Sequence, residues 1–505
     1  MIIVQQGKSV ARAALVIMAA ATIARILGYV RDVAIYTRFG QNYATDAFNA
    51  AFSIPDFIYM LLVGGALSSA FIPVFSGYLA VEKREQAWKT ASVIFNFTMV
   101  GMLVLIAGAY VFTRPLIMLL VPRLPHETID LAVTLTRIMF VQTMFMALNG
   151  LAMGVLNSHK EFVTPALGGI LYNVGIITVG LALSDRWGIA AFSVGVVVGA
   201  LMSVAVQVPA LLRVRPSYSF SFDWRDQGFR EIMVLMLPVL IGLSVTQFNL
   251  FVSQNLASGL GSGTISALKL AQRIMQLPLG IFAVSVAIAV FPTLTGLVAR
   301  NQMSEFKQAT SLGVRTVFFI ILPSALGLMA LREPIIALLF QQGSFTVQNT
   351  QTTAWALFYY ALGLFAYSAL QVLNRAFYAI KDTVTPVATG VATIAINIGL
   401  SVWLVRLWGY RGLALAYSVA GTLNMMALLV LLRMRVGAIG GRRIAQSFAL
   451  SLGASLVMYV TARSTALGLL HWLPLAAKLS QLVAVFAAIT LGVVVYGGIA
   501  LLVRM

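Results

Sequence analysis

The chain has 505 residues, of which 60% are hydrophobic and only 10% are charged. Because soluble domains carry about 25% charged residues, this composition excludes a soluble protein and indicates one that crosses a membrane many times. The net charge of +19 would suggest nucleic acid in a soluble protein, but here we attribute it to basic residues kept on the cytoplasmic side, and we expect no nucleic-acid partner.

The first apolar segment follows Lys8 and Arg12 and superficially resembles a signal peptide. Arg25 and Arg31 interrupt it, however, and no small-residue cleavage pattern follows a clean apolar core. We therefore expect an uncleaved first span.

Beyond it, the apolar runs are about 20 residues or longer, which favours helices over the alternating strands of about 10 residues found in barrels. We predict an all-α polytopic membrane protein with about fourteen transmembrane helices. Their expected ranges are 9–37, 45–77, 88–112, 128–155, 162–184, 188–212, 230–258, 264–298, 309–330, 350–379, 384–406, 411–433, 443–464 and 475–503. Glycine and proline within spans predict bends, at Pro55, Gly64, Gly65, Pro73, Pro278 and Pro292.

An even number of spans places both termini on one side of the membrane. That side holds 20 of the 34 basic residues, so we expect both termini to be cytoplasmic. No connecting segment is long enough for a soluble catalytic domain, and we expect a protein that is not an enzyme.

Three motifs recur at a nearly constant offset. Lys160–Pro165 matches Lys381–Pro386 at 221 residues, and two further pairs, at Pro115/Pro334 and Phe71/Val290, match at 219. This predicts two pseudo-symmetric six-helix lobes that run in the same direction, followed by two C-terminal helices. The expected domains are an N-lobe at 1–214, a cytoplasmic linker at 215–229, a C-lobe at 230–435 and an appendix at 436–505 that could hold a lipid tail.

Charged residues within apolar spans are the candidate site. A charge at the bilayer centre costs about 2.5 to 3.5 kcal/mol on insertion scales, so such residues usually face a wet cavity. Arg25, Arg31, Lys269 and Arg273 would together suit a large anion such as a diphosphate. The alternative is that each arginine pairs with a nearby acid, for example Arg31 with Asp32 or Asp46, or reaches an interface.

Three aspartates accompany these cations and are candidates for a gate or an ion pair: Asp32, Asp46 and Asp56. Asp46, with Thr45 beside it, could instead cap the second helix. With no cysteine and three histidines far apart in sequence, we expect neither a metal site nor a cofactor. A coupling ion such as sodium or a proton stays unassigned.

The chain resembles the MurJ (MviN) family of lipid II flippases, within the multidrug/oligosaccharidyl-lipid/polysaccharide exporter superfamily. The most specific matching motifs are A-R-I-L-G-Y-V-R-D (24–32), A-T-D-A-F (44–48), F-I-P-V-F (71–75), A-Q-R-I-M-Q-L-P-L-G (271–280), F-Q-Q-G-S-F-T (340–346) and F-Y-A-I-K-D-T-V-T-P (377–386). The family's essential arginines in spans one and eight correspond to Arg25, Arg31 and Arg273. Its acidic residue in A-T-D corresponds to Asp46.

The resemblance implies a flippase that moves undecaprenyl-diphosphate-linked disaccharide-pentapeptide to the outer leaflet for peptidoglycan synthesis, cell-wall biogenesis and cell shape. It implies a multi-pass protein of the bacterial cytoplasmic membrane, which we expect to be a monomer that could meet cell-wall synthesis proteins. The chain departs from the family at Tyr59, Gly64, Gln272 and Gln276, where some members have charged residues. This puts the gating salt bridges, though not the cationic cavity, in question.

Three alternatives stay open. A flippase for another polyprenyl-linked oligosaccharide, such as an O-antigen or exopolysaccharide unit, would have the same physical features. A membrane enzyme acting on polyprenyl-linked sugars would need a grouped catalytic acid or base, which the sequence lacks. A drug/cation antiporter would favour acidic residues over arginines in its cavity.

Overall fold

A computed structural model describes residues 2–63, 66–472 and 477–503. Within these ranges the chain is helical and contains no strand, as predicted. Ten helices are long and apolar enough to cross a membrane, or eleven when the bent pair α16–α17 is counted as one span. The helix α1, the broken series α2–α4 and the helix α11 lie outside this set, so the expected count of about fourteen is consistent with the structure.

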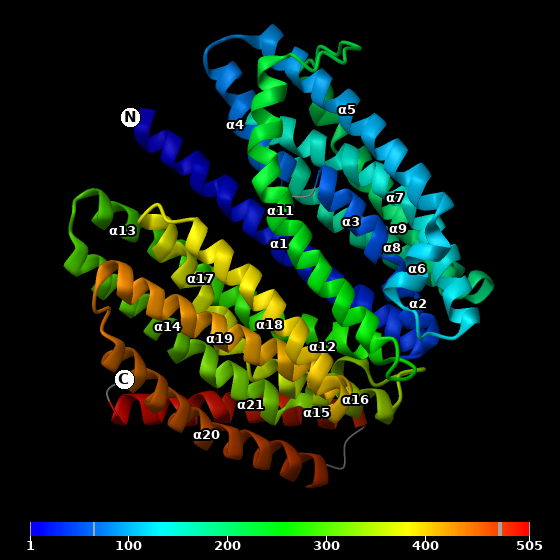
Figure 1. Cartoon of the computed structure of the whole chain (residues 1–505). Helices are drawn as coiled ribbons and strands as arrows, with labels where there is room; N and C mark the ends of the chain where they lie inside the picture. The colour runs from blue at the N-terminus through cyan, green and yellow to red at the C-terminus, as the bar shows by residue number, and fades with distance from the viewer. Residues whose placement is uncertain (1, 64–65, 473–476, 504–505) are drawn as a thin grey trace. The chain divides into compact units, whose positions relative to one another are not determined.

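The chain divides into two compact units, Met1–Gly259 and Leu260–Met505, and Figure 1 traces the helices of each. The first unit contains α1 (Ile2–Phe39), α2 (Tyr43–Ala51), α3 (Ser53–Leu62), α4 (Ala66–Ala80), α5 (Arg84–Val111), α6 (Thr113–Leu120), α7 (His126–Ser158), α8 (Val163–Trp187), α9 (Ala190–Ala205), α10 (Val208–Arg213) and α11 (Gln227–Ala257). In it, α11 packs against α3, α4, α5 and α6. The lobe boundaries expected at 214 and 230 were inferred from the sequence repeat, whereas the two units are defined by contacts between residues. These lobe boundaries therefore stay a prediction.

The second unit contains α12 (Thr264–Pro278), the π-helix η1 (Leu279–Ala283), α13 (Val284–Ala299), α14 (Met303–Ala330), α15 (Arg332–Phe340), α16 (Val347–Ala361), α17 (Leu364–Ala379), α18 (Val384–Trp408), α19 (Tyr410–Val436), α20 (Gly441–Trp472) and α21 (Ala477–Leu502). Figure 1 shows α20 and α21 side by side along α14, with which α20 makes extensive contact. Lys478 of α21 donates hydrogen bonds to the carbonyl oxygens of Ala337 and Leu338, at 2.7 and 3.1 Å. A cation therefore caps the C-terminal end of α15. It stabilises this end by binding carbonyl oxygens that have no partner within the helix.

The internal geometry of the two units confirms the predicted repeat. The helices α5 and α14 both have 28 residues, and α8 and α18 both have 25. Gly188 and Gly409 end the latter pair with nearly identical backbone angles, φ 54°, ψ −140° and φ 56°, ψ −135°. This positive φ is a conformation that glycine adopts without steric cost. The repeat therefore extends from sequence motifs to helix lengths and helix ends.

Bends occur at only some of the predicted glycines and prolines. The second span breaks at Phe52, between α2 and α3, and Pro278 is followed by the π-helix η1. Pro73 and Pro292 instead lie inside continuous helices, while Gly64 and Gly65 lie outside the described residues. The short helices α6 and α15, which follow long spans by one residue, were not predicted.

Candidate functional site

Arg31 of α1 is held at the boundary with α8. Its side chain is 17% exposed and its Nη2 lies 3.0 Å from Oδ1 of Asp32, to which Nε also donates at 3.2 Å. Nη1 makes a longer contact of 3.4 Å with Oδ1 of Asn173. Asn173 donates to the carbonyl oxygens of Ala24 and Gly169. The guanidinium is therefore oriented from two sides, as a preorganised anion ligand would need.

A tyrosine on α8 connects Arg31 to the second span. The Tyr172 hydroxyl donates to Oε1 of Gln142 at 3.3 Å and interacts electrostatically with Arg31, Asp56 and Tyr59. Side chains of α1, α8 and α7 are thus linked by hydrogen bonds near one partly buried cation, and the charge of Asp56 on α3 acts on the same tyrosine. Gln142, Tyr172 and Asn173 were not predicted from the sequence, although an isolated amide within an apolar span is a detectable signal.

The predicted aspartates lie in different environments. Asp32 is buried and forms an ion pair with Arg31, one of the two acid partners considered for this arginine; the pair leaves the role of Arg31 as an anion ligand a prediction. Asp56 is exposed. Asp46 is completely buried, and the expectation that it caps the second helix is wrong. The helix begins at Tyr43, so Asn42 is the N-cap and completes a capping box with Thr45.

The remaining candidate cations lie on α1 and α12. Arg25 is exposed on α1. Lys269 is exposed and Arg273 is partly exposed on α12 in the second unit. Between them, Gln272 makes a side-chain hydrogen bond with Tyr417 of α19. Tyr417 stacks on Tyr367, with ring centroids 4.3 Å apart. The face of α12 that carries Gln272 therefore packs against α19. Lys269 and Arg273 lie at the surface of the second unit.

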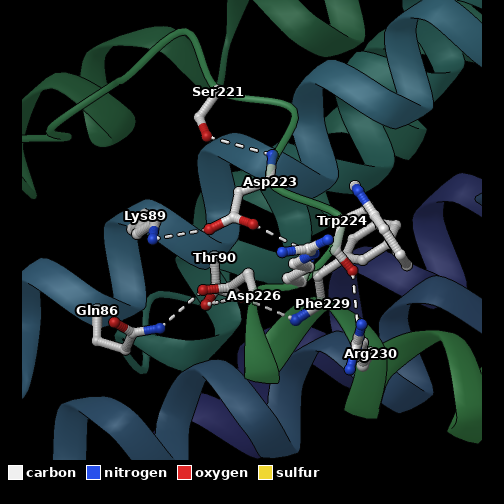
Figure 2. Close-up of polar contacts among 10 residues, drawn as sticks. Gln86, Lys89, Thr90, Ser221, Asp223, Trp224, Asp226, Phe229 and Arg230 are labelled. Carbon is white, nitrogen blue, oxygen red and sulfur yellow. Dashed lines mark hydrogen bonds and ion pairs between the residues drawn. The ribbon is translucent and has the colours of Figure 1, made fainter.

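The segment between α10 and α11 forms an extended strap along α5, which we define as residues 214–226. Figure 2 shows two carboxylates that attach it. Asp223 lies 3.0 Å from Nζ of Lys89, and buried Asp226 accepts from Thr90 Oγ1 and Gln86 Nε2, both at 2.8 Å. Asp226 also caps α11 by accepting from the Phe229 amide at 2.9 Å.

Replacing Asp226 by alanine should destabilise the first unit. The change removes the N-cap of α11 and leaves the fully buried Thr90 hydroxyl without its acceptor, at an expected cost of about 2 to 4 kcal/mol. Thermal unfolding of the purified protein measures the loss. Asp226→Asn keeps an acceptor and a cap, so it should melt close to wild type. Equal melting of both variants would contradict the proposed role.

The strap should loosen in acid. Hydrogen bonds from Lys89 and from the Arg225 amide hold the pKa of Asp223 below its ordinary value, which is about 3.9. A carboxylate with a lowered pKa stabilises the attachment when the pH is above its ordinary pKa. This contribution to stability is lost as the pH falls through the lowered pKa. Hydrogen exchange at the Ser219 amide, corrected for intrinsic rates, should rise in that range. Asp223→Asn should remove this step; if the step persists in the variant, Asp223 is not its origin.

Among the described ranges, no group of three or more histidine, aspartate or glutamate residues could hold a metal ion.

The chain matches known proteins along most of its length. The model of the family described as lipid II flippase MurJ matches residues 35–489. A probable lipid II flippase MurJ of Bdellovibrio bacteriovorus is 31% identical over 98% of this chain and 95% of its own. A lipid II flippase MurJ of Burkholderia cenocepacia is 29% identical over 91% and 89%.

A solved structure of lipid II flippase MurJ, in an inward closed conformation, superposes with a TM-score of 0.81 at 27% identity, covering 97% of this chain and 99% of that one. A multidrug resistance MATE family transporter superposes with a TM-score of 0.69 at 15% identity over 84% and 98%, which concerns the fold alone. The family match extends across both units and includes every predicted site residue from Asp46 to Arg273. The chain is a multi-pass membrane protein that belongs to the lipid II flippase MurJ family.

Proposed function

We propose that this protein moves lipid II, the undecaprenyl-diphosphate-linked disaccharide-pentapeptide, from the inner to the outer leaflet for peptidoglycan synthesis. The family match supports the substrate class. The observation that carries the mechanism is the partly buried Arg31, oriented by Asp32 and Asn173. A guanidinium offers two parallel donors to phosphate oxygens, and a diphosphate is the part of this substrate that needs them.

In the proposed mechanism, Arg25, Arg31, Lys269 and Arg273 form the cationic site, and the repeated units expose it alternately to the two sides. The Nη1 contact of Arg31 with Asn173 is long, at 3.4 Å, so a phosphate oxygen can replace it at little cost. Asp32 would keep the guanidinium in place between substrates. Asp46 and Asp56 are the proposed gate residues. The polyprenyl tail would follow α20 and α21 in the bilayer.

Transport needs no bond to be made or broken, and we propose that the protein is not an enzyme. The membrane potential can reset a cationic site, because moving one charge across it is worth about 2.3 kcal/mol per 100 mV. A sodium ion or a proton could couple to the same step. The basic segments support cytoplasmic termini in the bacterial inner membrane. We propose a monomer, which could act beside cell-wall synthesis proteins.

Arg273→Gln tests the site in the second unit. Loss of a charge-assisted hydrogen bond costs about 1.5 to 3 kcal/mol, so lipid II affinity should fall about ten- to hundredfold. Native mass spectrometry with purified lipid II measures this change. Arg300→Gln is the matched control, because Arg300 is exposed and bonds Gln302 at the end of α13. Equal affinity in both variants would remove Arg273 from the site.

Depletion in cells tests the substrate. If lipid II is transported, depletion should cause lysis with lipid II accumulating in the membrane. Accumulation of another polyprenyl-linked oligosaccharide would assign the protein to that substrate instead. Conversion of lipid II by the purified protein would overturn the transport proposal.

A further inference from the structure

The first unit contains an apolar cavity apart from Arg31 and its partners. Its volume is about 250 Å³, and α4, α5, α7, α9, α10 and the strap surround it. The walls are mostly apolar side chains, among them Phe71, Trp88, Ala91, Leu151, Ala152 and Tyr218. The cavity is open on one side, and an apolar group that moves from water onto such apolar walls gains free energy in proportion to the area buried. This cavity therefore favours an apolar occupant over water.

Two polar side chains of the cavity wall, Tyr218 and Ser92, already form hydrogen bonds. Tyr218 donates its hydroxyl to Oδ1 of Asn96 at 2.6 Å, and Ser92 accepts from the Ser219 amide at 3.1 Å. Asn96 in turn donates to the Ser221 carbonyl oxygen at 2.8 Å. These bonds fix the strap as one wall of the cavity. An apolar group that enters the cavity breaks none of these hydrogen bonds. Its removal from water therefore contributes favourable free energy with no polar cost from them.

The rim of the cavity is basic. Leu211 and Pro216 both line it, and the turn between them carries Arg213 and Arg215, which are exposed. Arg215 has a positive φ of 51°, which reverses the chain from α10 into the strap. The turn therefore carries two exposed arginines between residues that line the cavity, on the side that we propose to be cytoplasmic. Trp88 and Tyr218 add the amphipathic rings typical of a membrane–water interface.

We propose that this cavity binds one acyl chain of an anionic phospholipid from the cytoplasmic leaflet, with its phosphate near Arg213 and Arg215. The apolar walls match the chain, and the basic turn matches the headgroup. A volume of about 250 Å³ lies below the ~300–1,000 Å³ of pockets for whole drug-sized ligands. It accommodates part of a chain but no disaccharide-pentapeptide headgroup. The site is therefore separate from lipid II transport and independent of that function.

Photolabelling tests this site without any mutation. The purified full chain is reconstituted with phosphatidylglycerol that carries a diazirine in its acyl chain, and the labelled peptides are identified by mass spectrometry. Label should appear on Ala91 and Ala152, which are buried and out of reach of the surrounding bilayer. It should decrease when unlabelled phosphatidylglycerol competes, and less with phosphatidylcholine. Label confined to lipid-facing residues would overturn the proposal.

Two kinds of variant distinguish binding of the acyl chain from binding of the headgroup. Ala152→Phe fills the cavity and should abolish labelling of α5, whereas Ala182→Phe, at an exposed alanine on α8, should not. Arg213→Gln and Arg215→Gln change only exposed side chains. Each should lower the preference for phosphatidylglycerol over phosphatidylcholine about fivefold. Arg186→Gln, at an exposed arginine on α8, is their control. An unchanged preference in both arginine variants would refute the basic headgroup contact, even if Ala152→Phe failed to fold.

Discussion

Replacing Arg31 by glutamine is expected to reduce lipid II transport about ten- to hundredfold, because the substrate loses a charge-assisted donor. The same change should also destabilise the protein by about 3 kcal/mol, since it leaves the Asp32 carboxylate, 9% exposed, without its cation. A transport assay in vesicles and thermal unfolding measure the two effects.

The double variant Arg31→Gln/Asp32→Asn separates binding from folding. A neutral amide pair removes the uncompensated charge, so stability should return towards wild type while transport stays low. Arg38→Gln/Asp185→Asn is the matched control. That pair likewise involves an arginine of α1, here with an aspartate of α8, but it is exposed, at 47% and 76%, and such pairs contribute about 0 to 1 kcal/mol. Wild-type transport by the Arg31/Asp32 double variant would show that Arg31 is not a substrate ligand.

The contrast between these two ion pairs indicates how far sequence reasoning reaches. Arg31 and Arg38 both lie on α1, but only Arg31 falls within the predicted span 9–37, where the cost of charge in a membrane singles it out. The sequence does not show that Arg31 faces Asn173 of α8, because residues 142 positions apart meet only through packing. Candidate cations and the neighbouring acid Asp32 could therefore be predicted, but partners on other helices could not.

The long spans and the repeat were predictable because both leave linear signals. A run of about twenty apolar residues identifies a span, and similar motifs at offsets near 220 residues identify the repeat. The short helix α15 was missed although Pro334 lies in its first turn, a position typical of helix starts. The strap leaves a weaker signal: its polar, basic sequence predicts a linker, while its path depends on Asn96 and Thr90 of α5.

Glycines between α8 and α9 carry the second large expected effect. Gly195 and Gly199 lie four residues apart on α9, the spacing of close helix packing in membranes. A Cβ atom at Gly175 would lie 2.5 Å from the Gly199 Cα, and one at Gly199 would overlap the Tyr172 carbonyl oxygen. Because both obstacles are backbone atoms, the helices must separate to accept a side chain.

Gly199→Leu should therefore destabilise the protein by about 3 kcal/mol or more and reduce transport as well. Separating α8 from α9 moves Tyr172 and Asn173, which orient Arg31, so the two losses have one cause. Gly108→Leu is the matched control, because a Cβ atom at Gly108 of α5 meets no atom within 4 Å. Thermal unfolding and vesicle transport compare them. If Gly199→Leu melted and transported like Gly108→Leu, the close contact of α8 and α9 would not support the Arg31 site.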